Sequence, residues 1–428
     1  MDIMKQDSNP KNMNMTNIKI RNIGPIAKAE FDLNKVNVFM GPQSSGKSTI
    51  AKICSQCIWC EKNYLLTGDE YDFYRGLLEF HRMDEGYFTD DSEISYESQW
   101  VTIKFKGTKR ETFFSKKKKA ANLYKNLKIE YIPAERNFAA ALPNLERYSE
   151  GYDNIINFLK DWLSFKETIT INGKYSSPLS SIDVNYKYDT KSKKDVLTLP
   201  NKKNILLQKS SSGQQSIIPL LVVCEFMFTA LYEQRRISSS AEQSYIKGNL
   251  PDTMKADYEW VIKEESFPHK SNSAQDVRLL KETKEKIWNE IGISSDYGLS
   301  NVIIEEPEQN LFPETQKELI YHILNKVIDA KRDHQLILTT HSPYILYALN
   351  NCMLGGLVKD NIPSDELDTF QSKVSWIDPE LVSVWEIENK TIRQIKNNET
   401  GTVSKHYFNG IMNDVMEEYY DLLTFLKK

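Results

Sequence analysis

The sequence predicts an α/β protein with a mostly parallel core sheet, an antiparallel β subdomain and helical insertions. Short apolar runs at Val36–Met40, Asn301–Ile304 and Gln335–Thr339 are typical of buried strands. Each run leads into a glycine-rich or polar loop, and a segment of helical character follows. By contrast, Asn17–Ile23 alternates polar and apolar residues, as a half-buried strand does.

The other elements follow from local patterns. Gly24-Pro25 marks a turn, and Thr49–Cys60 is apolar on most sides, which indicates a buried helix. Ile237–Leu299 is mostly polar and charged, and we expect a helical insertion there. Further strands are expected at Ala29–Leu33, Glu93–Lys106, Glu111–Ser115 and Lys128–Ile132, within Thr168–Leu207, and as paired edge strands in Trp376–Ile395. Further helices are expected at Asn154–Lys166, Ser216–Tyr232 and Thr315–Asp329.

Composition narrows the class of protein. Five cysteines, an odd number, argue against a disulfide framework and favour the cytoplasm. No segment approaches the roughly 20 uninterrupted apolar residues of a membrane helix, so no membrane association is expected. The net charge of -4 does not indicate DNA binding, which would need a local basic patch.

A glycine-rich loop follows the apolar run at Val36–Met40. It matches the pattern G-x-x-x-x-G-K-[ST] between a strand and a helix, where backbone N–H groups can surround phosphates. Lys47 would reach the β- and γ-phosphates of a nucleotide, and Ser48 would hold Mg²⁺. The expected ligand-binding residues are Gly41, Pro42, Gln43, Ser44, Ser45, Gly46, Lys47, Ser48 and Thr49.

Two carboxylates end the apolar run at Asn301–Ile304. The carboxyl edge of a parallel strand is where ligands bind in α/β sheets. We expect Glu305 to hold Mg²⁺, directly or through water, and Glu306 to act as general base toward the attacking water. Taken alone, the same pattern also fits a solvated strand end.

Polar residues also follow the run at Gln335–Thr339. His341 could hydrogen-bond a γ-phosphate and report its presence. Ser342 and Pro343 also fit a helix N-cap and first helical residue, and both interpretations can hold together.

A serine-rich turn, Ser210–Ser216, precedes the apolar helix. Small hydroxyl residues and a glycine at a helix N-terminus form a second anion site, which makes sense if it contacts the γ-phosphate held by another copy. A serine-capped helix with no ligand is the alternative. The predicted contacts are Ser211, Ser212, Gly213 and Gln214.

In their order along the chain, the four motifs resemble those of the ABC-type P-loop ATPase heads of the SMC, RecF and OLD group. In that resemblance the glycine-rich loop is the Walker A loop, and the serine-rich turn is the signature. Glu305 and Glu306 belong to Walker B, with Glu306 as its catalytic glutamate, His341 is the switch histidine, and Glu308–Pro313 falls at the D-loop. Tyr131–Asn137 (YIPAERN) and Ser211–Ser216 (SSGQQS) look closer to compact ATPases of bacterial antiphage operons, such as the PARIS and Septu ATPase subunits.

This sequence departs from the family pattern at three points. Glu305 stands where aspartate is usual, and Gln214 replaces the second glycine of the signature. A glutamine loop is not obvious: Gln99 and the Pro133–Arg136 segment are candidates, and the latter makes Arg136 a predicted nucleotide contact.

The resemblance implies five regions. Residues 1–16 would be a flexible N-terminus, 17–130 an N-terminal ATPase lobe with Walker A and the β subdomain, and 131–236 a helical and β region with the signature. Residues 237–299 would be the helical insertion, and 300–428 the C-terminal lobe with Walker B, D-loop and switch histidine.

The resemblance also implies a function. Two copies would form a head-to-tail dimer around ATP and Mg²⁺, with higher assembly possible, and would hydrolyse the ATP. OLD nucleases carry a Toprim domain with a D-x-D motif, which is absent after Pro343. We therefore expect no nuclease domain in this chain, and a separate effector, such as a nuclease or toxin, under its control in antiphage defence. A RecF-like or SMC-like head that clamps DNA in repair is the alternative.

Two further patterns have structural explanations. Cys54, Cys57 and Cys60 have the spacing C-x-x-C-x-x-C, but they lie on a predicted buried helix, and core packing explains them. Lys116–Lys119 fits a solvated loop tip better than a contact to a phosphate backbone.

Overall fold

The chain folds into two compact units. In the computed structural model, unit 1 comprises Met1–Tyr124 and Glu380–Lys428, and unit 2 comprises Lys125–Pro379. The residues that the structure describes are 16–117, 126–142, 151–171, 173–233, 247, 250–266, 278–280, 282–283, 286–287, 297–328, 332–397 and 399–426. The expected flexible N-terminus, apart from residue 16, and Lys118 and Lys119 of the lysine run lie outside these residues.

The strands of unit 1 run in the order β6-β5-β4-β1-β2-β15-β14-β3. Neighbours from β6 to β2 pair antiparallel, which is the predicted antiparallel subdomain. β14 pairs parallel with β3. The strands are β1 (Thr16–Ile23), β2 (Ile26–Leu33), β3 (Val36–Met40), β4 (Phe88–Glu97), β5 (Val101–Lys106), β6 (Glu111–Lys116), β14 (Val382–Glu388) and β15 (Thr391–Gln394).

The hairpin of β14 and β15 was expected at a sheet edge, and this expectation is wrong. β15 lies between β2 and β14, and β14 lies between β15 and β3. Val384 and Ile387 on β14 are completely buried, as suits an interior strand. The strand also begins later than expected, because Pro379–Leu381 forms a 3-10 turn before it.

Helix α1 (Lys47–Thr67) confirms the predicted buried helix and extends it at both ends. Cys54, Cys57 and Cys60 on this helix have no exposed surface, and burial raises the pKa of each thiol, so all three stay protonated. Core packing therefore accounts for the cysteine spacing. Short helical turns follow at α2 (Phe73–Arg75) and Gly76–Phe80.

Unit 2 contains a parallel sheet with the order β13-β12-β7, as predicted for the core strands. A separate antiparallel sheet has the order β11-β10-β9-β8. The strands are β7 (Leu127–Ile132), β12 (Leu299–Glu305), β13 (Gln335–Thr340), β8 (Tyr175–Ser176), β9 (Asn185–Asp189), β10 (Lys194–Thr198) and β11 (Asn204–Leu206).

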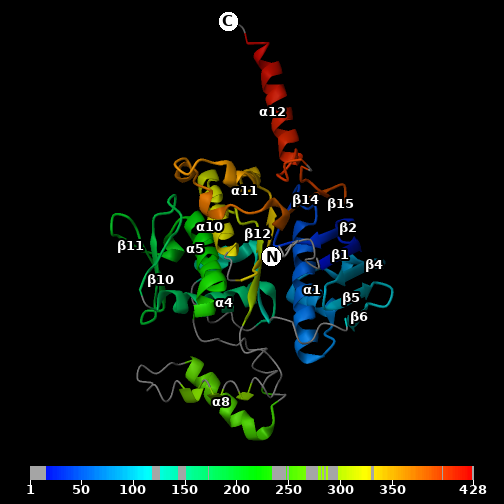
Figure 1. Ribbon diagram of the computed structural model, residues 1–428, viewed down its shortest axis with the longest axis vertical. Coiled ribbons are helices and arrows are strands. Elements are labelled where there is room, and N and C mark those ends of the chain that lie inside the picture. Colours follow the sequence, from blue (N-terminus) through cyan, green and yellow to red (C-terminus); the bar gives the residue numbers. More distant parts are fainter. Residues whose placement is uncertain are drawn as a thin grey trace, which may run out of the picture. The chain divides into compact units, whose positions relative to one another are not determined.

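In unit 2, α3 and α4 pack against the apolar helix α5, and α4 runs beside it (Figure 1). The segment Ser212–Ala230 is long and apolar enough to cross a membrane, but 72% of that window is buried inside the protein, as in a core helix. The rings of Phe165 and Phe226 stack against each other in this core. The helices are α3 (Phe138–Ala141), α4 (Asn154–Thr170), α5 (Ser212–Glu225), α6 (Leu231–Glu233), α8 (Asp252–Ser266), α10 (Pro313–Val327) and α11 (Pro343–Val358).

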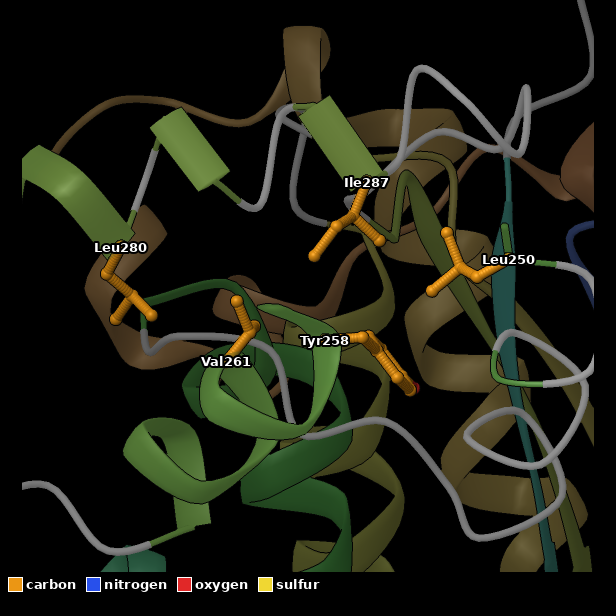
Figure 2. Packing of buried hydrophobic residues seen from close by; sticks show 5 residues of the cluster. All are labelled: Leu250, Tyr258, Val261, Leu280 and Ile287. Atoms are coloured by element: carbon orange, nitrogen blue, oxygen red, sulfur yellow. The ribbon is translucent and has the colours of Figure 1, made fainter. Parts of the chain in front are cut away.

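Helix α8 has a small apolar cluster of its own within the predicted insertion. Figure 2 shows Leu250, Leu280 and Ile287 arranged around Tyr258 and Val261 of α8. All five side chains are at most 4% exposed. The described residues of this segment therefore share an apolar cluster of their own.

The chain ends in helix α12 (Tyr407–Leu423), which the sequence analysis did not anticipate. His406 and Asn409 form a capping box at its start. Figure 1 shows α12 as a single long helix, and none of its residues is buried.

Candidate functional site: a phosphate loop and an acid–histidine pair

The predicted phosphate loop of unit 1 joins β3 to α1, and its backbone requires glycine at two positions. Gly41 has a φ of 153°, and a Cβ there would lie 2.6 Å from the carbonyl oxygen of Ile387. Gly46 has a φ of 107°, and a Cβ there would lie 2.5 Å from the Cδ1 of Ile26. Side chains cannot be accommodated at either position, so the loop keeps its tight curve.

Lys47 opens α1 and folds back over this loop. Its Nζ donates to the carbonyl oxygens of Gly41 at 2.9 Å and Pro42 at 2.7 Å. The first turn of α1 contains no acidic residue, and no side chain caps it. Gln43, Ser44 and Ser48 are exposed. A positive helix end, backbone donors, a lysine and exposed hydroxyls fit a bound phosphate group.

The acidic end of β12 in unit 2 has an unusual backbone. Glu305, the last residue of the strand, is 4% exposed. The next residue, Glu306, has a φ of 44°, in the left-handed region that non-glycine residues seldom adopt. Its N–H donates to the carbonyl oxygen of Thr339 on β13 at 2.9 Å. Strained residues of this kind gather at functional sites, because the surrounding structure must hold them there.

The turn brings Glu306 against His341, which follows β13. The Nε2 of His341 lies 3.1 Å from the Oε1 of Glu306, and both side chains are about one third exposed, at 31% and 32%. Ser342 caps α11 as predicted, because its Oγ accepts from the N–H of Tyr344 at 3.1 Å. An acid and an imidazole thus meet at a solvent-accessible position on the carboxyl edge of the sheet.

Glu308 holds the two strand ends together, a role that the sequence analysis missed. Its Oε1 accepts from the Oγ1 of Thr340 at 2.9 Å and from the N–H of His341. Burial raises the pKa of this carboxyl. The signal in the sequence was a third glutamate two residues after Glu306, but its bonding partners lie on another strand.

Arg136 lies beneath the same turn. It follows β7 in a 3-10 turn (Ala134–Asn137) and has no exposed surface. Its guanidinium donates to the carbonyl oxygens of Glu305 at 2.9 Å, Glu306 at 2.8 Å and Pro307 at 3.3 Å. Arg136 was predicted to contact the nucleotide, whereas its full burial against main-chain carbonyls favours a role in holding this turn. Gln99, the other candidate for a glutamine loop, is exposed between β4 and β5.

The signature turn is a formed helix N-terminus. Ser211 caps α5: its Oγ accepts from the N–H of Gln214, and the side chain of Gln214 returns a bond to the N–H of Ser211. This capping box gives Gln214 a local partner where the family pattern has glycine. Ser211 and Ser212 are exposed. A Cβ on Gly213 would lie 2.9 Å from the carbonyl oxygen of Asn310 in the predicted D-loop, so the two turns touch.

The structure therefore brings together, within unit 2, the predicted Walker B, switch and signature residues and Arg136. The predicted Walker A residues lie together in unit 1. A glutamine, Gln316, supplies one more link in unit 2: it accepts from the Oγ of Ser342 at 2.5 Å and donates to the carbonyl oxygen of Leu311 at 2.8 Å.

The comparisons with known proteins agree with an ATPase. Residues 294–346, which contain the acidic strand end and His341, match the family model of the AAA ATPase domain. This match supports an ATPase domain in this part of the chain. The comparison with curated proteins gave no match.

The comparison with solved structures found SMC and RecF structures at low TM-scores. The SMC head domain from Thermotoga maritima has a TM-score of 0.36 at 9% identity, over 90% of this chain and 98% of that one. The Smc head domain from Pyrococcus furiosus, with an extended coiled coil and bound to the C-terminal domain of ScpA, has a TM-score of 0.36 at 9% identity, over 95% and 99%. RecF of the RecFOR pathway has a TM-score of 0.31 at 11% identity, over 89% of this chain and 98% of that one. Similarity at these scores carries no inference about mechanism or partners.

Proposed function

We propose that this chain is a Mg²⁺-dependent ATPase that acts as a head-to-tail dimer. The observation that carries the proposal is the contact between Glu306 and His341, which a strained turn holds at the end of a buried strand. An acid with restricted backbone and partial exposure suits a general base, whose efficiency depends on its position.

Each residue of the site has a separate proposed role. Lys47 and the loop amides bind the phosphates of ATP, and Ser48 and Glu305 hold Mg²⁺. The metal neutralises charge on the phosphates when it is bound. Glu306 orients and deprotonates the attacking water, and His341 hydrogen-bonds the γ-phosphate. Arg136 keeps the backbone of Glu305 and Glu306 in place and does not itself touch the nucleotide.

The signature turn supports the dimer. Ser211 and Ser212 are exposed at the start of a helix of 14 residues, and the capping box already orders that start. A helix N-terminus attracts anions. We infer that Ser212 and Gly213 of one copy contact the γ-phosphate held by the other copy. The contact of Gly213 with the D-loop then couples this phosphate binding to the position of Glu306.

The dimer would control a separate effector protein. The sequence resemblance of the Tyr131–Asn137 and Ser211–Ser216 segments to ATPases of antiphage operons supports this role, in the cytoplasm. Pull-down from the native host, with and without ATP, tests it. An ATP-dependent complex with a nuclease or toxin would support effector control, whereas ATP-dependent recovery of DNA alone would favour the DNA-clamping alternative.

The substitution Glu306→Gln tests the ATPase and the dimer together. Loss of the base should stop phosphate release while ATP binding continues, so the variant should accumulate as an ATP-bound dimer in sedimentation experiments. Glu366→Gln, an exposed acid just before the 3-10 turn Leu367–Thr369, is the matched control and should hydrolyse normally. Unchanged turnover by Glu306→Gln would remove its assignment as base.

The trans contact has its own test. Ser212→Arg adds bulk and charge at the proposed interface, so it should abolish dimerisation with ATP, while binding of ATP by the isolated chain persists. A normal ATP-dependent dimer of this variant would show that the signature turn lies outside the interface.

A further inference from the structure

Helix α12 carries an apolar surface that nothing in the described chain covers. Six side chains at helical spacing are 38–63% exposed, and we call them the α12 stripe: Met412, Val415, Met416, Tyr419, Leu422 and Leu423. At about half exposure, six large side chains present on the order of 600 Å². With an equal area on a receptor, the total reaches about 1,200 Å², the lower bound for a specific protein interface.

The charges on α12 exclude one class of occupant. The face away from the stripe carries Asp414, Glu417, Glu418 and Asp421, and residues 407–426 include neither lysine nor arginine. Helices that bind membrane surfaces carry basic residues beside their apolar face, because bilayers are commonly anionic. The α12 stripe is therefore a surface for protein.

The width of the α12 stripe argues against simple pairing of two α12 helices. The six residues occupy the a, d and e positions of a heptad repeat, whereas a two-stranded coiled coil covers only the a and d seam. A groove between two helices covers a wider arc. Such a groove is the better complement to α12.

Unit 2 offers a groove of this kind. Pro313 and Lys317 of α10 and Tyr344, Tyr347 and Ala348 of α11 line a cavity of about 250 Å³. The apolar surface continues along α11, where Leu354 is 45% exposed. The stripe helix has 17 residues and α11 has 16, so each is about 25 Å long at 1.5 Å per residue.

We propose that α12 of one copy lies in the α10–α11 groove of a second copy. Such a contact is heterologous, since each chain presents one helix and one groove, and it generates closed rings or open chains according to the rotation between copies. It needs no nucleotide. It is independent of the proposed function, and it leaves the signature turn of every copy available for the ATP-dependent dimer.

Paired variants test the proposal in the full chain without nucleotide. Val415→Glu should prevent binding through the α12 stripe, and Leu354→Glu should prevent binding in the groove, because each places a charge in an apolar contact. Each variant alone should weaken self-association at least about 100-fold in analytical ultracentrifugation. An equimolar mixture of the two variants still contains one intact helix and one intact groove. It should therefore form a species of two chains and nothing larger.

The controls separate this interface from others. Asn413→Glu adds the same charge to α12 outside the stripe and should associate like the wild type. Tyr419→Glu and Tyr347→Glu repeat the pair at other positions, and circular dichroism and ATP binding report whether each variant is folded. A monomeric wild-type chain across the concentration range would overturn the proposal. It would also fail if Leu354→Glu assembled normally, because α12 would then pair with α12, or if the mixture stayed monomeric.

Discussion

Replacing Arg136 by methionine should separate ATP binding from ATP hydrolysis. The guanidinium donates to three successive main-chain carbonyls, those of Glu305, Glu306 and Pro307. Methionine fills similar space but donates nothing. The turn that carries Glu306 would lose its support, whereas the phosphate loop, in the other unit, would keep all of its own contacts.

The magnitude follows from two opposing contributions. A hydrogen bond to a charged group contributes about 1.5–3 kcal/mol, so three of them contribute roughly 4–9 kcal/mol. Burial opposes the charge and lowers the pKa of Arg136 from 12.5 to about 10, which corresponds to about 3 kcal/mol. The bonds exceed this cost, so Arg136→Met should reduce the free energy of unfolding by roughly 1–6 kcal/mol.

The effect on turnover should be larger than the effect on binding. A displacement of about 1 Å in a catalytic group can reduce a rate about 100-fold, so we expect kcat to fall to that extent while ATP affinity changes less than about threefold. Single-turnover hydrolysis and titration with a fluorescent ATP analogue measure the two quantities. Loss of affinity with normal single-turnover rates would show instead that Arg136 contacts the nucleotide.

Arg332→Met is the matched control. Arg332 donates to the carbonyl oxygens of Tyr297 and Gly298 just before β12, at the opposite end of that strand, and lies over the ring of Tyr232. Its loss should lower stability without a selective fall in kcat. Equal loss of kcat in both variants would mean that general destabilisation, and not support of the turn, explains the result for Arg136.

Three further predictions follow from single contacts. Lys47→Ala should abolish ATP binding in the fluorescent titration, and retained affinity would overturn the assignment of the loop. Gly213→Ala places a methyl group 2.9 Å from the carbonyl oxygen of Asn310 in the D-loop, so it should lower ATPase activity while the N-terminal turn of α5 stays helical. Activity equal to that of the wild type would show that the signature turn and the D-loop are not coupled. Burial raises the pKa of Glu61 from 4.5 to about 7, so the folded state holds a proton that the unfolded state releases between those values, and stability falls as pH rises through that window. Glu61→Gln should remove about 3 kcal/mol of that decline in urea unfolding between pH 4.5 and 8, and an identical pH profile would exclude Glu61 as its source.

Local patterns in the sequence predicted the strands that form the centre of each unit. β3 has the predicted bounds, and β12 and β13 differ from the predictions by one or two residues, because buried strands are short, apolar and followed by loops. The placement of β14 and β15 could not be predicted in this way. Their position depends on pairing with β3 and β2, far away in the sequence, and alternation alone does not distinguish an interior hairpin from one at an edge.

The candidate site was predictable in its residues and not in its bonding. The sequence indicated that Glu306 and His341 lie at the same sheet edge, because both follow parallel strands. The supporting contacts of Arg136 and Glu308 connect residues on three different elements, and no periodicity reports them. Helix α12 was not predicted, although its apolar residues recur at helical spacing.

The left-handed backbone of Glu306 has an evolutionary consequence. Glycine adopts such a conformation without steric cost, so Glu306→Gly would relieve local strain and could raise the melting temperature of the fold. The same change removes the proposed base. Selection for thermal robustness alone would thus drive this position toward inactive sequences, and persistence of the acid in a lineage would record selection for turnover.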